Sequence, residues 1–148
     1  MIRKCTAPML ALLTTVSACQ QGAPRPDGAT ASPSGKIDSI ANQHWHLIEL
    51  NGKTVDGAAS QFFIKLTEPE GRVQAKAGCN SMTGQYAITE RNRIRFSLLA
   101  STRMACPDMS QENALAAALA AANHFTHKGD TLSLLQDSQV LARFVPAQ

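Results

Sequence analysis

Apolar and polar residues alternate along several short stretches of this chain, which is the pattern of strands that bury one face. In residues 44–50, Trp45 and Leu47 fall on the same face, and the stretch ends at Asn51-Gly52, a strong signal for a tight β-turn. The return begins at 53–55, and the pattern predicts further strands at 62–66, 72–77, 86–89 and 94–98, the last two forming a hairpin over Arg91-Asn92. About five short strands are therefore expected in this part of the chain.

The hydrophobic period then changes, and an alanine-rich helix is expected over 110–125. Its apolar positions recur at helical spacing and are Leu115, Leu119, Ala122 and Phe125. Asp108 or Ser110 can cap the start of this helix, and the negative charge of Glu112 suits its first turn.

Two more strands are expected after a turn at Gly129-Asp130, at 131–136 and 140–145. Their core-facing residues are expected to be Leu132, Leu134, Leu141 and Val145. The predicted order of strands, one helix and a closing hairpin indicates an α+β fold. We expect a small antiparallel sheet, strongly curved and packed against one helix.

The chain begins with the parts of a secretory signal in residues 1–18: Arg3 and Lys4, a short apolar run, and small residues. The run Val16-Ser17-Ala18-Cys19 resembles the lipobox of bacterial lipoproteins. This resemblance implies cleavage before Cys19 and attachment of lipid to its sulfur. By the sorting rule of such lipoproteins, Gln20 in place of an aspartate directs the protein to the outer membrane.

Residues 19–42 contain many Pro, Gly, Ser, Ala and Thr residues and few large apolar ones. Such a segment buries too little surface to offset the entropy of ordering it, so we expect a lipidated N-terminus followed by a flexible tether. One small domain is then expected over 43–147. The formal net charge of +3 for the 148 residues falls to +1 when Arg3 and Lys4 leave with the signal. This near-neutral balance argues against a nucleic-acid partner.

The chain has four cysteines, of which Cys5 lies in the signal and Cys19 is the predicted lipid site. In an oxidising compartment the remaining Cys79 and Cys106 most simply form a disulfide. The alternative is a redox or Cu(I) site, because thioether sulfurs lie nearby in the sequence at Met82, Met104 and Met109. Neither a CxxC motif nor a histidine pair completes such a site, so we expect a disulfide and no metal.

Two pairs of histidines are candidate metal ligands. His44 and His46 share a strand face, and His124 and His127 are expected at the helix end. No carboxylate or cysteine stands beside either pair in the sequence, so solvated or packing roles are favoured.

Two other polar groups have simple structural interpretations. Ser101-Thr102-Arg103 could bind an anion before the helix, but packing is favoured because the sequence places no base or nucleophile elbow there. Arg91, Arg93 and Arg95 would form a basic stripe on one strand face, which could meet lipid phosphates or simply face solvent. We expect Gly78 and Gly84 to allow unusual backbone angles.

Several motifs together resemble the META domain family of HslJ-like heat-inducible bacterial lipoproteins. The motifs, in chain order, are Trp45-x-Leu47 before Asn51-Gly52, Ala77-Gly78-Cys79-Asn80, Gly84-x-Tyr86, residues 101–107, Glu112 and Gly129-Asp130-x-Leu132-x-Leu134. The resemblance implies an open or cracked barrel closed by one helix, with links to heat, envelope stress and antibiotic tolerance. It implies no catalytic residues.

The expected function is that of a non-enzymatic lipoprotein, anchored to the outer membrane and facing the periplasm, which binds an unidentified envelope partner. No catalytic residue, cofactor or metal is expected. The alternative is a pilot-like carrier that holds an acyl chain or hydrophobic peptide in an apolar groove. In that alternative, room for the ligand would come from the small residues of the helix, Ala116, Ala117, Ala118, Ala120 and Ala121.

Overall fold

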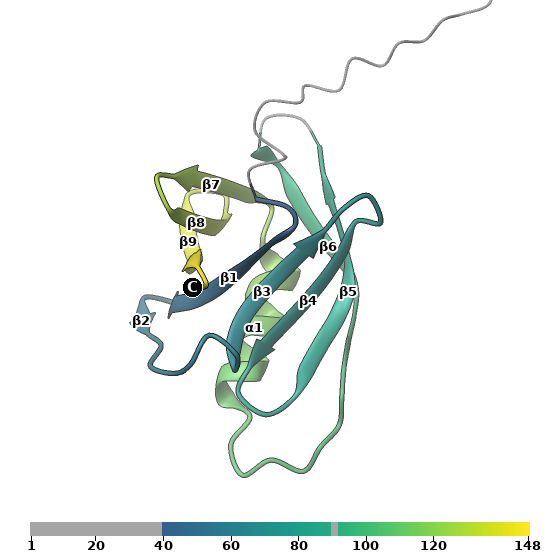
Figure 1. The fold of residues 1–148 in the computed structure, drawn as a ribbon, viewed down its shortest axis with the longest axis vertical. Coiled ribbons are helices and arrows are strands. Elements are labelled where there is room, and N and C mark those ends of the chain that lie inside the picture. The colour runs from purple at the N-terminus through teal and green to yellow at the C-terminus, as the bar shows by residue number, and fades with distance from the viewer. Residues whose placement is uncertain (1–39, 90–91) are drawn as a thin grey trace, which may run out of the picture. The chain divides into compact units, whose positions relative to one another are not determined.

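Nine strands and one helix make up the part of the chain that the structure, a computed structural model, describes: residues 40–89 and 92–148 (Figure 1). The strands before the helix are β1 (Gln43–Leu50), β2 (Lys53–Thr54), β3 (Phe62–Thr67), β4 (Arg72–Ala77), β5 (Ser81–Ile88) and β6 (Ile94–Ser101). Helix α1 (Ser110–Ala121) is followed by β7 (His124–Lys128), β8 (Thr131–Gln136) and β9 (Gln139–Pro146).

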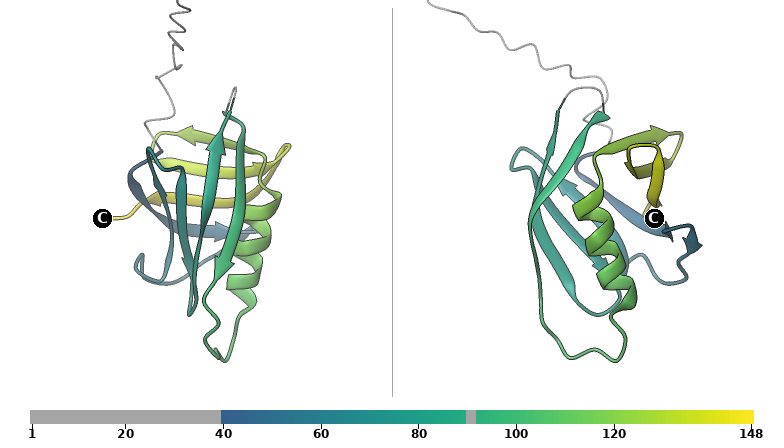
Figure 2. Two further views of the ribbon diagram at one scale, coloured as in Figure 1. Left: turned by 90° about the vertical axis from the view of Figure 1, so that its right-hand side faces the viewer. Right: turned by 180° about the vertical axis from the view of Figure 1, so that it is seen from behind.

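The strands form one antiparallel sheet in the order β6-β5-β4-β3-β1-β9-β8-β7, with β2 paired to β1. This sheet curls around α1, as the two views of Figure 2 show. At one end its terminal strands meet, because Arg93 forms a bridge with His124 and the Ile94 N–H donates to the Asn123 carbonyl oxygen at 3.2 Å. The predicted α+β fold, an open barrel packed against one helix, is confirmed.

The turn between β1 and β2 is the one that Asn51-Gly52 predicts. Both residues have positive φ angles, 51° and 76°, as a two-residue hairpin turn requires. Asparagine tolerates this left-handed region better than most residues, and glycine enters it without steric cost. The pair therefore fixes the register at the end of β1, where Leu50 pairs with Lys53.

The interior of the curled sheet is filled by side chains from most strands and from α1. Its fully buried large side chains include Trp45, Leu47, Ile64, Leu66, Leu115, Leu119, Leu132, Leu134 and Phe144. The indole N–H of Trp45 donates to the Ile40 carbonyl oxygen at 2.8 Å, so the polar atom of this buried ring is satisfied. Ile40 is itself fully buried, although the sequence placed it in the tether. The packed part of the chain therefore includes residues 40–42.

Strand β7 was not predicted, because Phe125 continues the helical spacing of the alanine-rich segment. The helix ends at Ala121, since the Asn123 N–H donates to the Leu135 carbonyl oxygen at 2.9 Å and so joins β8. The Asn123 side chain also accepts the Asp137 N–H at 2.7 Å. Phe125 is buried from a strand instead, and His124 and His127 lie on β7 rather than at the helix end.

The core face of β9 also differs from the predicted alternation. Leu141 is buried as expected, but Phe144 occupies the core and Val145 is only half-buried. The register between β8 and β9 shifts between Leu134 and Leu135, so that both Leu141 and Ala142 are buried. This bulge reverses which residues of β9 face inward.

Gly84 on β5 is needed for space, not for an unusual backbone angle. The pairing of β5 with β6 shifts between Thr83 and Gln85, and the β6 backbone bulges at Leu98, which has a φ of 52°. A Cβ atom at position 84 would lie 2.8 Å from the Ser97 carbonyl oxygen and 2.9 Å from a Leu99 methyl group. A side chain here would push the bulge away from β5.

We expect Gly84→Ala to destabilise the domain by about 1–3 kcal/mol, because the added methyl group overpacks the bulge. Urea unfolding of the variant and the wild type measures this difference. Thr83→Ala, at an exposed neighbouring position, is the control and should change the free energy of unfolding by less than about 0.5 kcal/mol. Equal stability of Gly84→Ala and wild type would contradict the packing argument.

Candidate functional site at the disulfide loop

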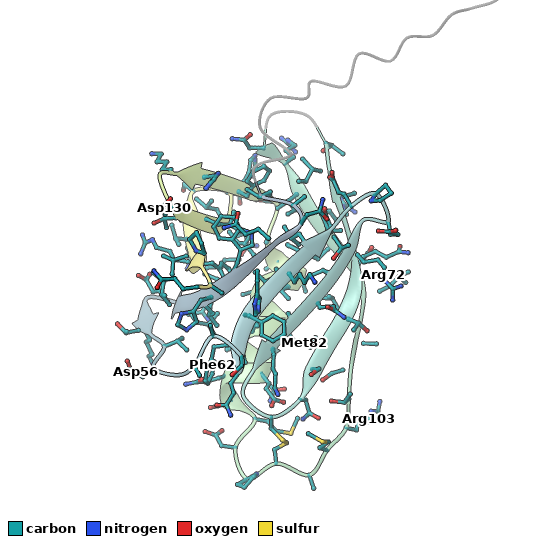
Figure 3. All side chains as sticks on the ribbon, viewed as in Figure 1. Asp56, Phe62, Arg72, Met82, Arg103 and Asp130 are labelled. Carbon is teal, nitrogen blue, oxygen red and sulfur yellow. A yellow bond between two sulfur atoms is a disulfide. The ribbon has the colours of Figure 1, made fainter. Side chains whose placement is uncertain are left out.

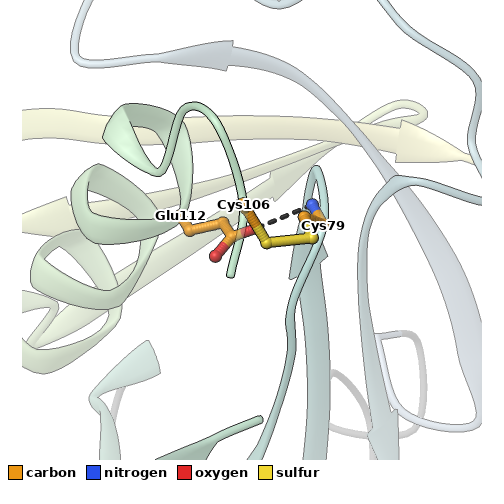
Figure 4. A group of neighbouring side chains, drawn as sticks. All are labelled: Cys79, Cys106 and Glu112. Atoms are coloured by element: carbon orange, nitrogen blue, oxygen red, sulfur yellow. Dashed lines mark hydrogen bonds between the residues drawn. A yellow bond between two sulfur atoms is a disulfide. The ribbon is translucent and has the colours of Figure 1, made fainter. Parts of the chain in front are cut away.

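The segment between β6 and α1 folds back against the connection between β4 and β5. We call this segment, residues 102–109, the disulfide loop. Cys106 of the loop is joined to Cys79 by a disulfide, with the two Cα atoms 6.3 Å apart (Figure 4). The ring that this bond closes spans a sequence separation of 27, for which the chain-entropy model gives about 3.5 kcal/mol of stabilisation.

Glu112, in the first turn of α1, is the carboxylate around which the site is built. Its side chain is only 4% exposed. Atom Oε1 accepts the backbone N–H groups of Cys79 and Asn80, both at 2.6 Å, and Oε2 accepts the Asn80 side-chain amide at 2.9 Å. Burial acts to raise the pKa of Glu112, but these donors and the Lys76 charge outweigh it and lower the pKa below its usual value. The group is therefore an anion at neutral pH.

Asn80 connects this carboxylate to the disulfide loop. Its side chain is fully buried, and Oδ1 accepts the Thr102 hydroxyl at 2.9 Å and the Met104 N–H at 2.8 Å. Its amide nitrogen, besides bonding Glu112, lies 3.3 Å from Cys106 Sγ. Thr102 Oγ1 in turn accepts the Ser81 N–H at 3.1 Å. One side chain therefore holds the strand connection, the loop and the helix together.

Two local features position the ends of this network. Gly78 has a φ of 118°, and a Cβ atom there would come within 3.6 Å of Glu112 Oε1. Neither predicted residue caps α1: the N-cap is Met109, which makes no side-chain capping bond, and Asp108 Oδ1 accepts the Ser110 N–H at 2.8 Å in the turn before the helix. That hydrogen bond lowers the pKa of Asp108.

A groove of about 480 Å³ lies between the end of β6 and the start of α1. Its lining combines apolar side chains with the polar groups of the site: Met82, Leu99, Ala100, Ser101, Thr102, Arg103, Met109, Glu112, Asn113 and Ala116. Arg103 projects outward at this edge of the molecule, as Figure 3 shows. Met104 and Met109 are 54% and 37% exposed, whereas Met82 is buried.

The structure brings together Cys79, Cys106 and Glu112 as potential metal ligands. The two cysteine sulfurs and one oxygen of the Glu112 carboxylate lie within 4.8 Å of one another. Because the two sulfurs are bonded to each other, neither is a thiolate in this form. Within residues 40–89 and 92–148, this is the group of three such side chains that has metal-ligand spacing.

The histidines are not gathered at this site. The His44 ring packs edge-on against Phe63, with centroids 4.5 Å apart, and His46 Nε2 lies 3.0 Å from the Gly57 carbonyl oxygen. The His127 ring packs against Trp45, and His124 Nδ1 lies 2.8 Å from the Asn123 side-chain oxygen.

The basic stripe and the predicted N-terminal features lie away from the groove or outside the described residues. Arg93 and Arg95 are exposed while Ile94 and Phe96 point inward, as the alternation predicts. Arg91, the signal at 1–18, Cys19 and the tether as far as residue 39 lie outside the described residues. Among the described residues, no helix is long and apolar enough to cross a membrane.

The META domain family matches residues 38–148, which include the whole network around Glu112. The chain belongs to the META domain family. No curated protein matches the chain.

Solved structures resemble this META domain in fold. An NMR structure of a protein from Burkholderia xenovorans is 21% identical, with a TM-score of 0.57 over 85% of this chain and 99% of that one. Another NMR structure is 20% identical, with a TM-score of 0.58 over 73% of this chain and 92% of that one. A DUF4847 family protein from Bacteroides vulgatus ATCC 8482 is 14% identical, with a TM-score of 0.56 over 75% and 96% of the two chains.

Most members of the META domain's site stand out one by one in the sequence, but their convergence does not. The sequence gives Glu112 only a favourable charge in the first turn of the helix, yet Glu112 shares a helical face with Leu115 and Leu119, both fully buried. A carboxylate on an apolar face signals a buried acceptor that needs donors. What the sequence could not supply was the identity of those donors, which come from the connection between β4 and β5.

We expect Glu112→Gln to lower the free energy of unfolding by about 2–3 kcal/mol at pH 7, because three N–H groups lose a charged acceptor. A carboxyl group whose pKa is lowered by folding stabilises the protein above its unfolded pKa, and that contribution is lost as pH falls through the folded pKa. The difference between wild type and variant should therefore shrink toward about pH 3. Urea unfolding at both pH values measures it.

Asp130→Asn, on the exposed turn between β7 and β8, is the control and should not change this pH dependence. A difference between wild type and Glu112→Gln that stays constant from pH 7 to pH 3 would show that the carboxylate charge is not what the site requires.

Proposed function

We propose that the chain is a non-enzymatic lipoprotein of the bacterial outer membrane, whose META domain binds an envelope partner at the groove beside the disulfide loop and so supports tolerance of heat or antibiotic stress. One observation carries the proposal. Exposed Met109 lines this groove together with half-buried Leu99, so apolar side chains from α1's approach and from β6 meet there, whereas exposed Leu98 lines a separate hollow. Apolar side chains that gather on a small soluble domain mark an interaction site.

The network beneath the groove supports a binding role. Both oxygens of Glu112 and both polar atoms of Asn80 are occupied by hydrogen bonds within the domain. Such groups hold a surface in shape, and the proposal gives them no part in chemistry. A preformed surface binds with less loss of conformational entropy than a flexible loop does.

The open edge of β6 indicates what kind of partner fits. Strand β6 is a terminal strand of the sheet, and its first residues are covered where Ile94 bonds to Asn123. At its other end the Thr102 N–H donates to the Ser81 carbonyl oxygen at 3.0 Å. Along an antiparallel strand, the N–H and C=O groups of successive residues point alternately toward one neighbouring strand and toward the opposite side. Because the N–H of Thr102 points toward β5, the N–H and C=O groups of Ser101 point away from β5, toward the groove. An extended segment of another protein can pair there and place apolar side chains against Leu99 and Met109.

The groove lies at the opposite end of the domain from the start of β1. Figure 1 shows the disulfide loop at the lower end of the domain, while β1 begins in the upper part of the view. In the proposal, the chain before β1 leads to lipidated Cys19.

An acyl chain lying in the same groove is the second candidate function, favoured by the apolar lining from Leu99, Met109 and Ala116. An acyl chain inside the sheet is not favoured, because the interior is filled. Of the five helix alanines proposed to make room for a ligand, Ala118 is buried in the core, Ala121 packs against the core, and Ala117 and Ala120 are exposed, which leaves Ala116 beside the groove.

The anchor has a direct test. We expect Cys19→Ala to abolish lipid labelling by a radioactive fatty acid, because the sulfur is the attachment point. The full chain and the variant would be expressed with the same signal and separated by density-gradient fractionation of envelopes. Cys5→Ala is the matched control and should stay in the outer-membrane fraction. Unchanged labelling of Cys19→Ala would contradict the lipoprotein proposal.

The groove is tested by two substitutions that separate its two candidate ligands. Met109→Glu places a charge among the apolar groups and should prevent binding of either ligand. Ser101→Pro removes one outward N–H from an edge strand, where proline is tolerated, and should prevent only strand pairing. Each variant would replace the wild type in cells that lack the gene, and survival of heat or novobiocin would be measured.

A peptide partner predicts that both groove variants fail to restore survival, whereas an acyl chain predicts that only Met109→Glu fails. Lys128→Glu, at the exposed end of β7, is the control and should restore survival. Circular dichroism of the purified variants checks that each is folded. Full survival with folded Met109→Glu would contradict the proposed site.

A further inference from the structure

Glu112 faces the Cys79–Cys106 disulfide at the distance of a metal ligand. Figure 4 shows its carboxylate beside the pair of sulfurs, with one oxygen hydrogen-bonded to the Cys79 N–H, and one carboxylate oxygen and both sulfurs lie within 4.8 Å of one another. We propose that reduction of this disulfide creates a Zn²⁺ site in which Cys79, Cys106 and Glu112 are the protein ligands. This inference goes beyond partner binding and does not depend on it.

The carboxylate is already oriented for this role. Oε1 is held by the N–H groups of Cys79 and Asn80, and Oε2 accepts one hydrogen bond, from the Asn80 amide. A carboxylate oxygen has two lone pairs, so Oε2 can also bind a metal. Hydrogen bonds of this kind fix the direction of a ligand and commonly decide metal affinity. The folded chain therefore already supplies the hydrogen-bond donors that would hold a zinc-binding carboxylate in position.

After reduction, the two cysteine sulfurs can move apart far enough to bind one cation. Both are partly exposed, so a reductant can reach the bond. Two thiolates on one tetrahedral Zn²⁺, with Zn–S bonds of about 2.3 Å, lie roughly 3.8 Å apart. The Cα atoms are 6.3 Å apart, and Cys106 lies in the disulfide loop rather than in a strand. The Asn80 amide, 3.3 Å from Cys106 Sγ, can donate to the thiolate that forms.

The chemistry balances with one co-reactant, a dithiol reductant of the thiol–disulfide oxidoreductase class. The dithiol gives two electrons and two protons to the Cys79–Cys106 bond and becomes a disulfide itself, which leaves two thiols. Zn²⁺ then displaces the two thiol protons and is held by two thiolates and one carboxylate, for a net charge of −1. Three protein ligands leave the fourth tetrahedral position for water.

The donor set favours Zn²⁺ over the Cu(I) that the methionines suggested from the sequence. Cu(I) prefers sulfur donors alone, whereas Zn²⁺ accepts thiolate and carboxylate together. The oxidised form holds no thiolate, so the disulfide is the state without metal. The site is thus opened and closed by the redox state of one bond.

The test uses the full chain in detergent, with Cys5→Ser and Cys19→Ser so that Cys79 and Cys106 are its remaining cysteines. The protein is reduced anaerobically with a phosphine, which does not compete for the metal as thiols do, and titrated with Co²⁺ as a coloured probe. We expect a thiolate-to-cobalt charge-transfer band that saturates at one Co²⁺ per chain and disappears when Zn²⁺ is added. The oxidised protein should give no band.

Glu112→Gln in the same background should weaken Co²⁺ binding roughly tenfold or more. Asp130→Asn removes a carboxylate far from the loop, as Figure 3 shows, and should leave the affinity unchanged. A missing band in the reduced protein would overturn the proposal. Equal Co²⁺ affinity of Glu112→Gln and wild type would also overturn it, because the two thiolates would then bind the metal without the Glu112 carboxylate.

Thermal unfolding of the reduced wild type keeps the proposal falsifiable if Glu112→Gln does not fold. Zn²⁺ should raise the melting temperature of the reduced protein by several degrees, EDTA should reverse the rise, and the oxidised protein should not respond. An unchanged melting temperature of the reduced protein would overturn the inference.

Discussion

The buried carboxylate of Glu112 is the interaction on which the functional end of this META domain depends. A charge that is 4% exposed persists only if the fold supplies donors, and here these are two backbone N–H groups and the Asn80 amide. The donors belong to the connection between β4 and β5, whereas the carboxylate belongs to α1. The helix therefore cannot move away from the sheet without leaving an unpaired buried charge.

This constraint explains how a groove can form beside a strand edge without collapsing. The disulfide fixes one point of the disulfide loop, and Asn80 fixes two more through Thr102 and Met104. With the loop held, Met109 and the end of β6 remain partly exposed instead of folding into the core. The same network gives the disulfide its carboxylate neighbour, so the proposed partner groove and the proposed metal site share one set of supporting contacts.

Much of the fold could be predicted because local signals agreed with the global pattern. The alternation of 62–66 and 72–77, the Asn51-Gly52 turn and the helical spacing of Leu115 and Leu119 each had one consistent interpretation. The sequence-based predictions were wrong where one pattern of apolar residues fits two different structures. Phe125 lies at helical spacing from Leu119 and Ala122, but the pairing of Asn123 with Leu135 places it in a strand. The bulge between β8 and β9 similarly reversed the buried face that alternation assigned to Val145 and Phe144.

The sequence by itself determined the alternation of strand faces, the two-residue turn, the helix and the family, because each depends on residues close together or on motifs in a fixed order. Only the tertiary structure decided that Glu112, Asn80, Thr102 and the two cysteines meet at one place. Their hydrogen bonds join residues as far apart as 33 positions, as in the pair Cys79 and Glu112. Which distant donor satisfies a buried acceptor depends on how the sheet curls and where the helix lies against it, and no local pattern of residues encodes that choice.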